Sequence, residues 1–481
     1  MKNMKKIQLI LLLFFSAVVI TCNSCADFLD VNTDPNNPAS APYKMVLPIA
    51  EMSTAAFYNN YLMIYGSIWA EHFSQNFTSN QYNAINDYNP QPTDFNWMWA
   101  ESFSGALNDY KNVINEAENA GDWNTYLIAT AMQAFHFAIL ADLFDKIPYS
   151  ESLQGNTGIL APKYDDGQSV YDDLLTRIDA ALSNDFSAIG NTVTGNSDYI
   201  FNGDMDKWKA FANTLKLKLY LRQTEISDVS AKLTQCLNSP YGFINEAMID
   251  GFTAEPGKRN PFYGVNMAGE GLGTDNFRAA DVLLDYLKNN GDIRYDGIYK
   301  SGPSTPGLFN SMLFGDRLNE GGSSESDKIA RGNWKTDDPV YFFTQPMVEF
   351  MIAEAKERTG VDGKSNYEAG INASFLNFGH SAADAAPLVN GTYAYPAARG
   401  EKIKAILTQK WIASAIRLPI EAWLDYNRTG YPDFLKPSAN SQLGGSFLPK
   451  RFLFPASETS RNVNAPPNEN NAIKNPVWWA K

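Results

Sequence analysis

Apolar side chains recur every three or four residues along much of the chain, and this spacing places them on one face of an α-helix. Stripes with this spacing run through residues 126–144, 171–182, 208–219, 348–355 and 401–425. Pro419 lies inside the longest stripe. Because proline has no backbone N–H, we expect it to kink that helix or to split it in two. The pattern predicts an all-α body.

Long polar stretches separate the predicted helices. They are rich in Gly, Pro, Asn and Ser and cover residues 74–97, 183–203, 251–276, 301–340, 380–400 and 436–475. Connections of this length are uncommon in compact domains and tend to carry function. Several predicted helices are neighbours in the chain, as in helical-repeat proteins, although their period is irregular. No linker divides the chain, so we predict one helical domain with elaborate loops.

The N-terminal segment predicts export. A basic start with three lysines precedes an apolar run over residues 7–20. At 14 residues this run is too short for a transmembrane helix, which needs about 20. A basic start followed by such a run is typical of a signal peptide. We therefore expect the chain to be exported. No later stretch approaches the length of a membrane span, so we expect its body to be soluble.

Two cysteines follow the apolar run. A cysteine directly after a signal peptide is where bacterial lipoproteins are cleaved and acylated. We therefore predict lipidation of Cys25, with 1–24 as the signal peptide and 25–481 as the mature helical domain. Cys22 is the alternative, because the residues before it are more apolar, although Thr21 suits the cleavage position less well. Ordinary secretion is a third interpretation. Two or three acyl chains would hold the protein on a membrane, since each buried methylene adds roughly 0.8 kcal/mol.

Composition and charge exclude several classes of protein. With 44% hydrophobic and 19% charged residues, the chain is neither disordered nor fibrous. Its 53 acidic residues against 39 basic ones give a net charge of −14, and no run of Lys and Arg occurs. We therefore predict no nucleic-acid partner. Three cysteines are too few for a disulfide framework or a thiolate metal site, and Cys236 is expected to be a buried free thiol.

Motifs for common enzyme chemistry are missing from the sequence. The three histidines, His72, His136 and His380, have no metal-binding spacing, and we expect His136 to be structural. Neither a G-x-S-x-G nucleophile elbow nor a P-loop occurs. We predict no catalytic residue, no metal site and no cofactor.

Two segments look like ligand loops at first sight. Oxygen-bearing residues in 30–36 are spaced as in a calcium loop, but Pro35 and Ala41 favour a turn instead. The glycine-rich run 269–273 fits a flexible loop better than a phosphate cradle. A pair of carboxylates that hydrolyses glycosidic bonds remains an alternative, because the distance between two such groups depends on the fold.

Aromatic rings and amides alternate in the predicted loops, and aromatic residues make up 13% of the chain. The C–H faces of a pyranose ring stack on aromatic rings, while amides and carboxylates bond its hydroxyl groups, so this mixture suits a sugar. The alternative is that the rings pin the loops to the helical scaffold. The candidate ligand-binding residues are Tyr82, Tyr88, Trp97, Phe262, Tyr263 and Trp334.

Ordered strings across nearly the whole mature chain resemble the SusD/RagB family of outer-membrane nutrient-binding lipoproteins, in particular its second, SusD-like branch. The strings lie at residues 27–38, 142–151, 162–165, 170–171, 203–204, 207–208, 211–216, 354–355, 409–413, 421–432, 449–452 and 477–479. Departures are small. Asn427 stands where the branch usually carries a second Arg, and the segment before Cys25 is an atypical lipobox.

The resemblance implies an all-α fold of tetratricopeptide-like helix pairs, with long irregular loops that form the ligand face. It also implies a lipoprotein that acyl chains hold in the outer membrane, exposed at the cell surface, with a SusC-type TonB-dependent transporter as its partner. Such proteins capture oligosaccharides, or peptides in some members, for import and are not enzymes. A peptide-binding member, a lipid-anchored glycoside hydrolase and a scaffold that binds only protein are the alternatives.

Overall fold

The fold is all-α, as the apolar spacing predicts. It was derived from a computed structural model that describes residues 41–192, 194–267, 276–318 and 321–480. Strands are short in this part of the chain, and each of its four sheets has two strands. The predicted features at Cys22, Cys25, 30–36 and 269–273 lie outside the described residues.

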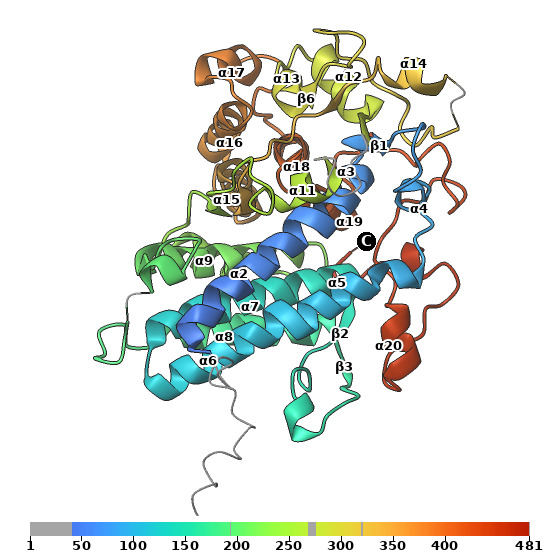
Figure 1. The fold of residues 1–481 in the computed structure, drawn as a ribbon. Helices are drawn as coiled ribbons and strands as arrows, with labels where there is room; N and C mark the ends of the chain where they lie inside the picture. The colour runs from blue at the N-terminus through green and yellow to red at the C-terminus, as the bar shows by residue number, and fades with distance from the viewer. Residues whose placement is uncertain (1–40, 193, 268–275, 319–320, 481) are drawn as a thin grey trace, which may run out of the picture.

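Four helices that follow one another in the chain pack as neighbours in the lower half of Figure 1. α6 (Leu107–Ala120) packs against α7 (Trp123–Phe144), α7 against α8 (Gly167–Leu182), and α8 against α9 (Met205–Arg222). α2 (Tyr43–Phe57) lies across α6 and α7. Three of the predicted stripes lie within α7, α8 and α9, so these helices are confirmed.

α7 is the central helix of this group. It has 22 residues, and an 18-residue window within it has a mean hydropathy of 1.6, which would suffice to cross a membrane. The expectation that no later stretch approaches that length was therefore wrong. Its apolar window is 100% buried inside the protein, which identifies α7 as a core helix. Asp122 caps its N-terminus by accepting a hydrogen bond from the backbone N–H of Thr125 at 3.3 Å.

A second group of helices lies above the first in Figure 1. It consists of α15 (Gln345–Arg358), α16 (Lys364–Asn377), α17 (Ala382–Val389), α18 (Arg399–Ser414) and α19 (Pro419–Thr429). α15 packs against both α16 and α18. The stripe predicted at 401–425 is split in two, because α18 ends at Ser414 and α19 begins at Pro419. Proline is tolerated at the first position of a helix, because a backbone N–H at that position has no hydrogen-bond partner within the helix.

The segments between these longer helices hold short strands and short helices. The antiparallel strand pairs are β1 (Phe73–Gln75) with β5 (Phe277–Ala279), β2 (Lys146–Pro148) with β3 (Tyr164–Asp166), β4 (Ala247–Ile249) with β8 (Val340–Phe343), and β6 (Tyr299–Lys300) with β7 (Arg331–Gly332). The short helices are α3 (Met63–Trp69), α4 (Asn83–Asn86), α5 (Asn96–Ala100), α10 (Ser230–Leu237), α11 (Pro261–Asn266), α12 (Asp281–Asn289), α13 (Tyr295–Ile298), α14 (Gly322–Ser326) and α20 (Ala456–Arg461). Two π-helical turns, η2 (Tyr58–Leu62) and η4 (Glu101–Ala106), follow α2 and α5.

Apolar side chains from both groups of helices form one continuous core, and a smaller cluster lies among α15 to α18. Cys236 is buried as a free thiol, as predicted, and burial raises its pKa to about 11. His136 is buried as well, and burial lowers its pKa to about 3. Its ring nitrogens lie 3.2 Å from the Thr54 hydroxyl and 3.0 Å from the Ser102 hydroxyl, which confirms a structural role.

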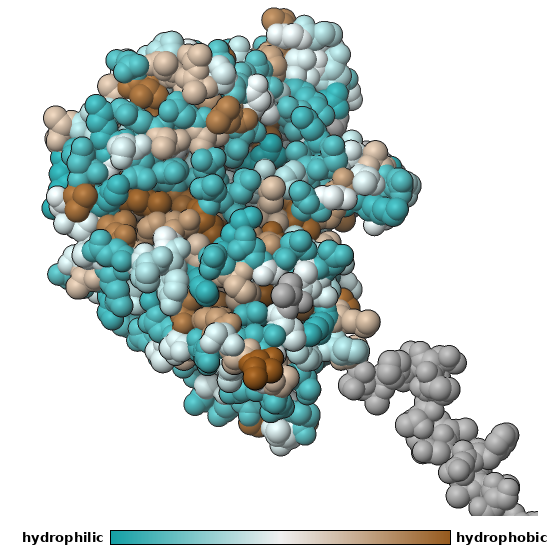
Figure 2. Space-filling view, turned by 90° about the vertical axis from the view of Figure 1, so that its left-hand side faces the viewer, coloured by the Kyte–Doolittle hydropathy of each residue, from teal (hydrophilic) through white to brown (hydrophobic). Residues whose placement is uncertain are grey.

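The outer surface contrasts with this interior. Figure 2 shows a face covered mainly by hydrophilic side chains, with apolar side chains gathered in a hollow across its middle and in smaller patches. Such a surface is expected of a body that faces water, since much of any folded surface is still apolar.

Buried charges join the two groups of helices. Arg222 on α9 donates hydrogen bonds to Glu421 at 2.7 Å and to Asp425 at 3.2 Å, both on α19. Arg428 on α19 donates to both carboxylate oxygens of Glu354 on α15, at 2.6 and 2.9 Å. Burial alone would raise the pKa of Glu354, but the charges of Arg428 and Arg358 and the hydrogen bonds from Arg428 together outweigh it and lower that pKa to about 2. The network fixes α9, α15 and α19 relative to one another.

Candidate ligand-binding cleft

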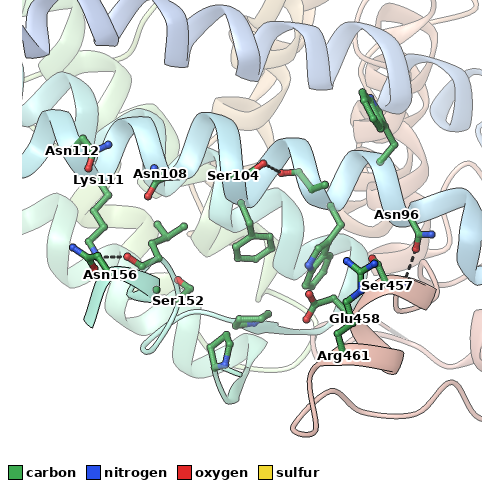
Figure 3. A pocket seen from close by; sticks show the side chains of 18 of the residues that line it. Asn96, Ser104, Asn108, Lys111, Asn112, Ser152, Asn156, Ser457, Glu458 and Arg461 are labelled. Atoms are coloured by element: carbon green, nitrogen blue, oxygen red, sulfur yellow. Dashed lines mark hydrogen bonds between the residues drawn. The ribbon is translucent and has the colours of Figure 1, made fainter. Parts of the chain in front are cut away.

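A cleft of about 950 Å³ opens at one side of the lower helix group. One wall is a helical run through α5, η4 and α6, and the facing wall comes from the segment 148–156 and from α20 (Figure 3). Pockets for small ligands have volumes of roughly 300–1,000 Å³, so this cleft is at the upper end of that range. It has room for a ligand of several rings.

The apolar floor of the cleft is built on the helical wall. Asn96, Trp99 and Phe103 are spaced by three and four residues and therefore share a helix face. Trp99 is only 4% exposed, and its ring centroid lies 4.8 Å from that of Phe103. The same indole is nearly parallel to the ring of Tyr164 on β3, at 14° and 6.1 Å. These contacts fix the floor before any ligand arrives.

Trp97 lies at the rim of the cleft. It is 67% exposed, far more than the buried Trp99 two positions later. Two residues along a helix are separated by about 200°, so the two indoles point to different sides. A large exposed ring beside a cleft offers apolar area that a ligand could cover. Trp97 is therefore the candidate stacking platform.

Three asparagines line the cleft on successive turns of α6. Asn108, Asn112 and Asn115 follow one another at spacings of four and three residues. Their side-chain amides make no hydrogen bond within the described residues. Asparagine is less favourable in a helix than alanine by up to about 0.7 kcal/mol, so this row weakens α6 without a compensating internal contact. Free amides of this kind are ready to bond hydroxyl or carbonyl groups of a ligand.

The facing wall is held to the helical wall by hydrogen bonds. The Asn96 side-chain oxygen accepts from the backbone N–H of Ser457 at 2.9 Å, which ties α20 to α5. The Glu458 carboxylate accepts from the Tyr164 hydroxyl at 3.0 Å. Burial and the charge of Glu458 raise the pKa of Tyr164 far above its usual value, so this hydroxyl stays protonated. Arg461 is exposed at the edge of the cleft, with no ion pair in the described part of the chain.

The lining of the cleft suits a polar ligand that also has apolar faces. Amides, hydroxyl groups and aromatic rings recognise polyhydroxylated ligands. Glu458 is the one carboxylate among the residues that line the cleft, whereas glycoside hydrolysis commonly uses two. Among the described residues, no group of three His, Cys, Asp or Glu side chains is placed to hold a metal ion.

The structure places four of the six predicted ligand-binding residues inside the protein. Tyr82, Tyr88, Phe262 and Trp334 are at most 7% exposed. The ring centroid of Trp334 lies 4.7 Å from that of Phe73 and 4.7 Å from that of Phe262. For these four residues the prediction of an exposed ligand-binding ring was wrong, because their rings pin the loops to the scaffold. This is the alternative that composition left open.

Tyr263 and Trp97 are the other two predicted residues. Tyr263 is half-buried and packs against the core, away from the residues that line the cleft. Trp97 lines the cleft, so its role in binding stays a prediction that the geometry favours. Sequence reasoning missed Trp99, Phe103 and the amide row of α6. The signal that could have found them is the spacing of three and four residues that continues past Trp97 into 99–115.

Comparison with known proteins gives a consistent family assignment. A family model described as "SusD-like_2: Starch-binding associating with outer membrane" matches residues 35–455. A comparison with curated protein sequences returned no match.

Solved structures with the same fold are numerous. A SusD homologue from Bacteroides uniformis has a TM-score of 0.75 and 22% identity, with 92% of this chain and 100% of that chain covered. A SusD/RagB family protein from Bacteroides thetaiotaomicron has a TM-score of 0.74 and 21% identity, with 92% and 99% covered. A chitin-binding SusD homologue from Flavobacterium johnsoniae has a TM-score of 0.74 and 20% identity, with 89% and 98% covered. At these identities the likeness establishes the fold.

Proposed function

The chain belongs to the SusD-like family of starch-binding proteins that associate with the outer membrane, and on that premise we propose that it binds oligosaccharides in the cleft beside Trp97. We further propose that it is a lipoprotein at the cell surface. In that place it would capture glycan nutrients without altering them and deliver them to a SusC-type TonB-dependent transporter. The chitin-binding name of one relative supports a saccharide ligand.

The observation that carries this proposal is the free amide row of α6 beside an exposed indole. Asn108, Asn112 and Asn115 have unused hydrogen-bonding groups, and Trp97 offers an apolar face at the rim of the same cleft. A sugar needs both kinds of contact at once, because its hydroxyl groups and its C–H faces lie on one ring.

Binding and cleavage should be measured together on a panel of oligosaccharides and peptides. We expect retention of at least one saccharide series and no cleavage. In calorimetry, Trp97→Ala should weaken that binding by about 1–3 kcal/mol, the usual contribution of an aromatic anchor at a recognition site. Ile189→Ala is the control, because Ile189 is fully exposed and does not line the cleft.

The panel separates the alternatives. Retention of peptides but not saccharides would make the protein a peptide-binding member of the family. Turnover of an oligosaccharide that Glu458→Gln abolishes would make it a glycoside hydrolase. Unchanged affinity in Trp97→Ala would remove the stacking role and, with it, the argument for this cleft.

A further inference from the structure

A second hollow of about 270 Å³ lies next to the cleft. The two cavities share part of their lining, so they are adjacent. The shared residues are Lys111, Asn115, Ser152 and Leu153.

α6 runs along both cavities. Asn108 and Asn112 line the cleft alone, and Asn115 lines both cavities. At a rise of 1.5 Å per residue, the distance from Asn108 to Asn115 along the helix is about 10 Å. Amides therefore recur along the groove at intervals of one helical turn. A linear chain of sugars presents hydroxyl groups at regular intervals, and a repeated row of amides matches such a ligand.

The junction between the cavities is held in a costly conformation. Leu153 has a φ of 59°, in the left-handed region that disfavours a branched side chain by about 1–2 kcal/mol. Its carbonyl oxygen accepts a hydrogen bond from the Lys111 ammonium group on α6. This bond keeps the segment 148–156 close to α6 where the cleft becomes the second hollow. Strained residues of this kind are common where a fold positions a ligand.

The second hollow repeats the chemistry of the cleft. The Tyr149 ring meets the Phe137 ring edge to face, with centroids 4.9 Å apart. The Tyr149 hydroxyl donates a hydrogen bond to the Asp173 carboxylate and accepts one from the Arg177 guanidinium at 3.1 Å. The same guanidinium donates to the Gln133 side-chain oxygen at 2.5 Å. An aromatic face and a fixed set of polar groups thus line this end as well.

We propose that the cleft and the second hollow form one groove that binds a linear oligosaccharide along α6, with the second hollow as a subsite for its distal sugar units. The inference rests on the proposed function and names the shape of its ligand. The protein would discriminate by chain length, since only a longer oligomer reaches both cavities.

Titration calorimetry with two size-graded series tests this groove. The probes are chitin and starch oligosaccharides from the disaccharide to the hexasaccharide. For the series that binds, we expect affinity to rise with length and then level off. Gln154→Ala, which changes the second hollow alone, should weaken binding of the longest oligomers about three- to tenfold, the size of one lost hydrogen bond, and leave the disaccharide unaffected.

Asn119→Ala is the matched control. Asn119 is an exposed asparagine one helical turn after Asn115, and it lines neither cavity. We expect it to bind every oligomer like the wild type. Affinity that does not depend on length, or equal losses for short and long oligomers in Gln154→Ala, would overturn the single groove while the proposed function stands. No binding of either series, when another glycan is retained in the panel, would overturn this inference alone. No binding of any saccharide would overturn both.

Discussion

Buried side chains with opposite charges determine which residues of this protein tolerate change. Glu354 is fully buried on α15 and receives hydrogen bonds from Arg428 and from Arg358, the second at 2.8 Å. Removing one member of such a set leaves a charge without a partner in a medium of low polarity. Lys364 and Glu368 on the surface of α16 are also paired, at 3.7 Å, but water screens that contact.

The pH dependence of stability should reveal the ion pair between Glu354 and Arg428. The pKa of the Glu354 carboxyl is about 2 in the folded protein and 4.5 in an unfolded chain. The charged form is favoured by folding, so its contribution of about 3 kcal/mol is complete above pH 4.5 and is lost as the pH falls toward 2. Glu354→Gln should be less stable than the wild type at pH 7 and show a flatter profile from pH 4.5 to 2 in urea unfolding. Glu368→Gln is the surface control and should keep the wild-type profile. If the stability of Glu354→Gln fell with pH as steeply as that of the wild type, the contribution of this ion pair would be contradicted.

The connection between α6 and α7 is fixed by its two terminal residues. Gly121 ends α6 with a φ of 66°, in the left-handed region. Asp122 then caps α7 and also accepts hydrogen bonds from the Thr192 backbone N–H at 3.1 Å and from the Tyr43 hydroxyl at 3.1 Å. The turn therefore holds α2 and the segment after α8 as well. The cleft depends on it, because α6 carries the amide row.

Two glycine substitutions should have opposite effects on unfolding. A methyl group at Gly121 meets no atom within 4 Å, so Gly121→Ala changes only the backbone cost, which we expect to be about 1–2 kcal/mol of stability lost. Gly400 lies in the first turn of α18, also without a neighbour within 4 Å. Gly400→Ala should stabilise the protein by about 0.5–1 kcal/mol, because alanine loses less entropy in a helix. Chemical denaturation measures both, and equal shifts of the same sign would refute the argument.

Local patterns predict the helices of this molecule better than its cleft. The stripe at 126–144 and the break at Pro419 are local signals, and both appear in α7 and in the start of α19. Whether a loop ring faces inward depends on distant partners. Trp334 is buried because β5 places Phe277 beside it, with centroids 5.3 Å apart. Composition alone carries no information on that pairing, so it overestimated the number of exposed rings.

Short helices in the polar stretches were missed for a similar reason. α17 lies within the stretch 380–400, which glycine and asparagine make look irregular. Its signal is a capping box, in which Ser381 and Asp384 exchange hydrogen bonds at 3.3 and 2.9 Å. The amide row of α6 was overlooked because an asparagine counts as a loop former until its place on a helix face is known.

At the scale of the whole molecule, the membrane attachment that we propose depends on acyl chains. The chain has a net charge of −14, so anionic lipids would repel its body. α7, the one helix in the described part of the chain that is long and apolar enough to span a bilayer, is enclosed by protein.

Metabolic labelling with palmitate and fractionation of membranes should therefore follow Cys25. We expect Cys25→Ala to lose the label and to leave the membrane fraction, since each buried methylene contributes roughly 0.8 kcal/mol. Cys22→Ala and Cys236→Ser should keep both, Cys236 because its thiol is buried in the fold. Loss of label in Cys22→Ala alone would move acylation to that residue, and full labelling of both N-terminal variants would contradict a lipid anchor on either cysteine.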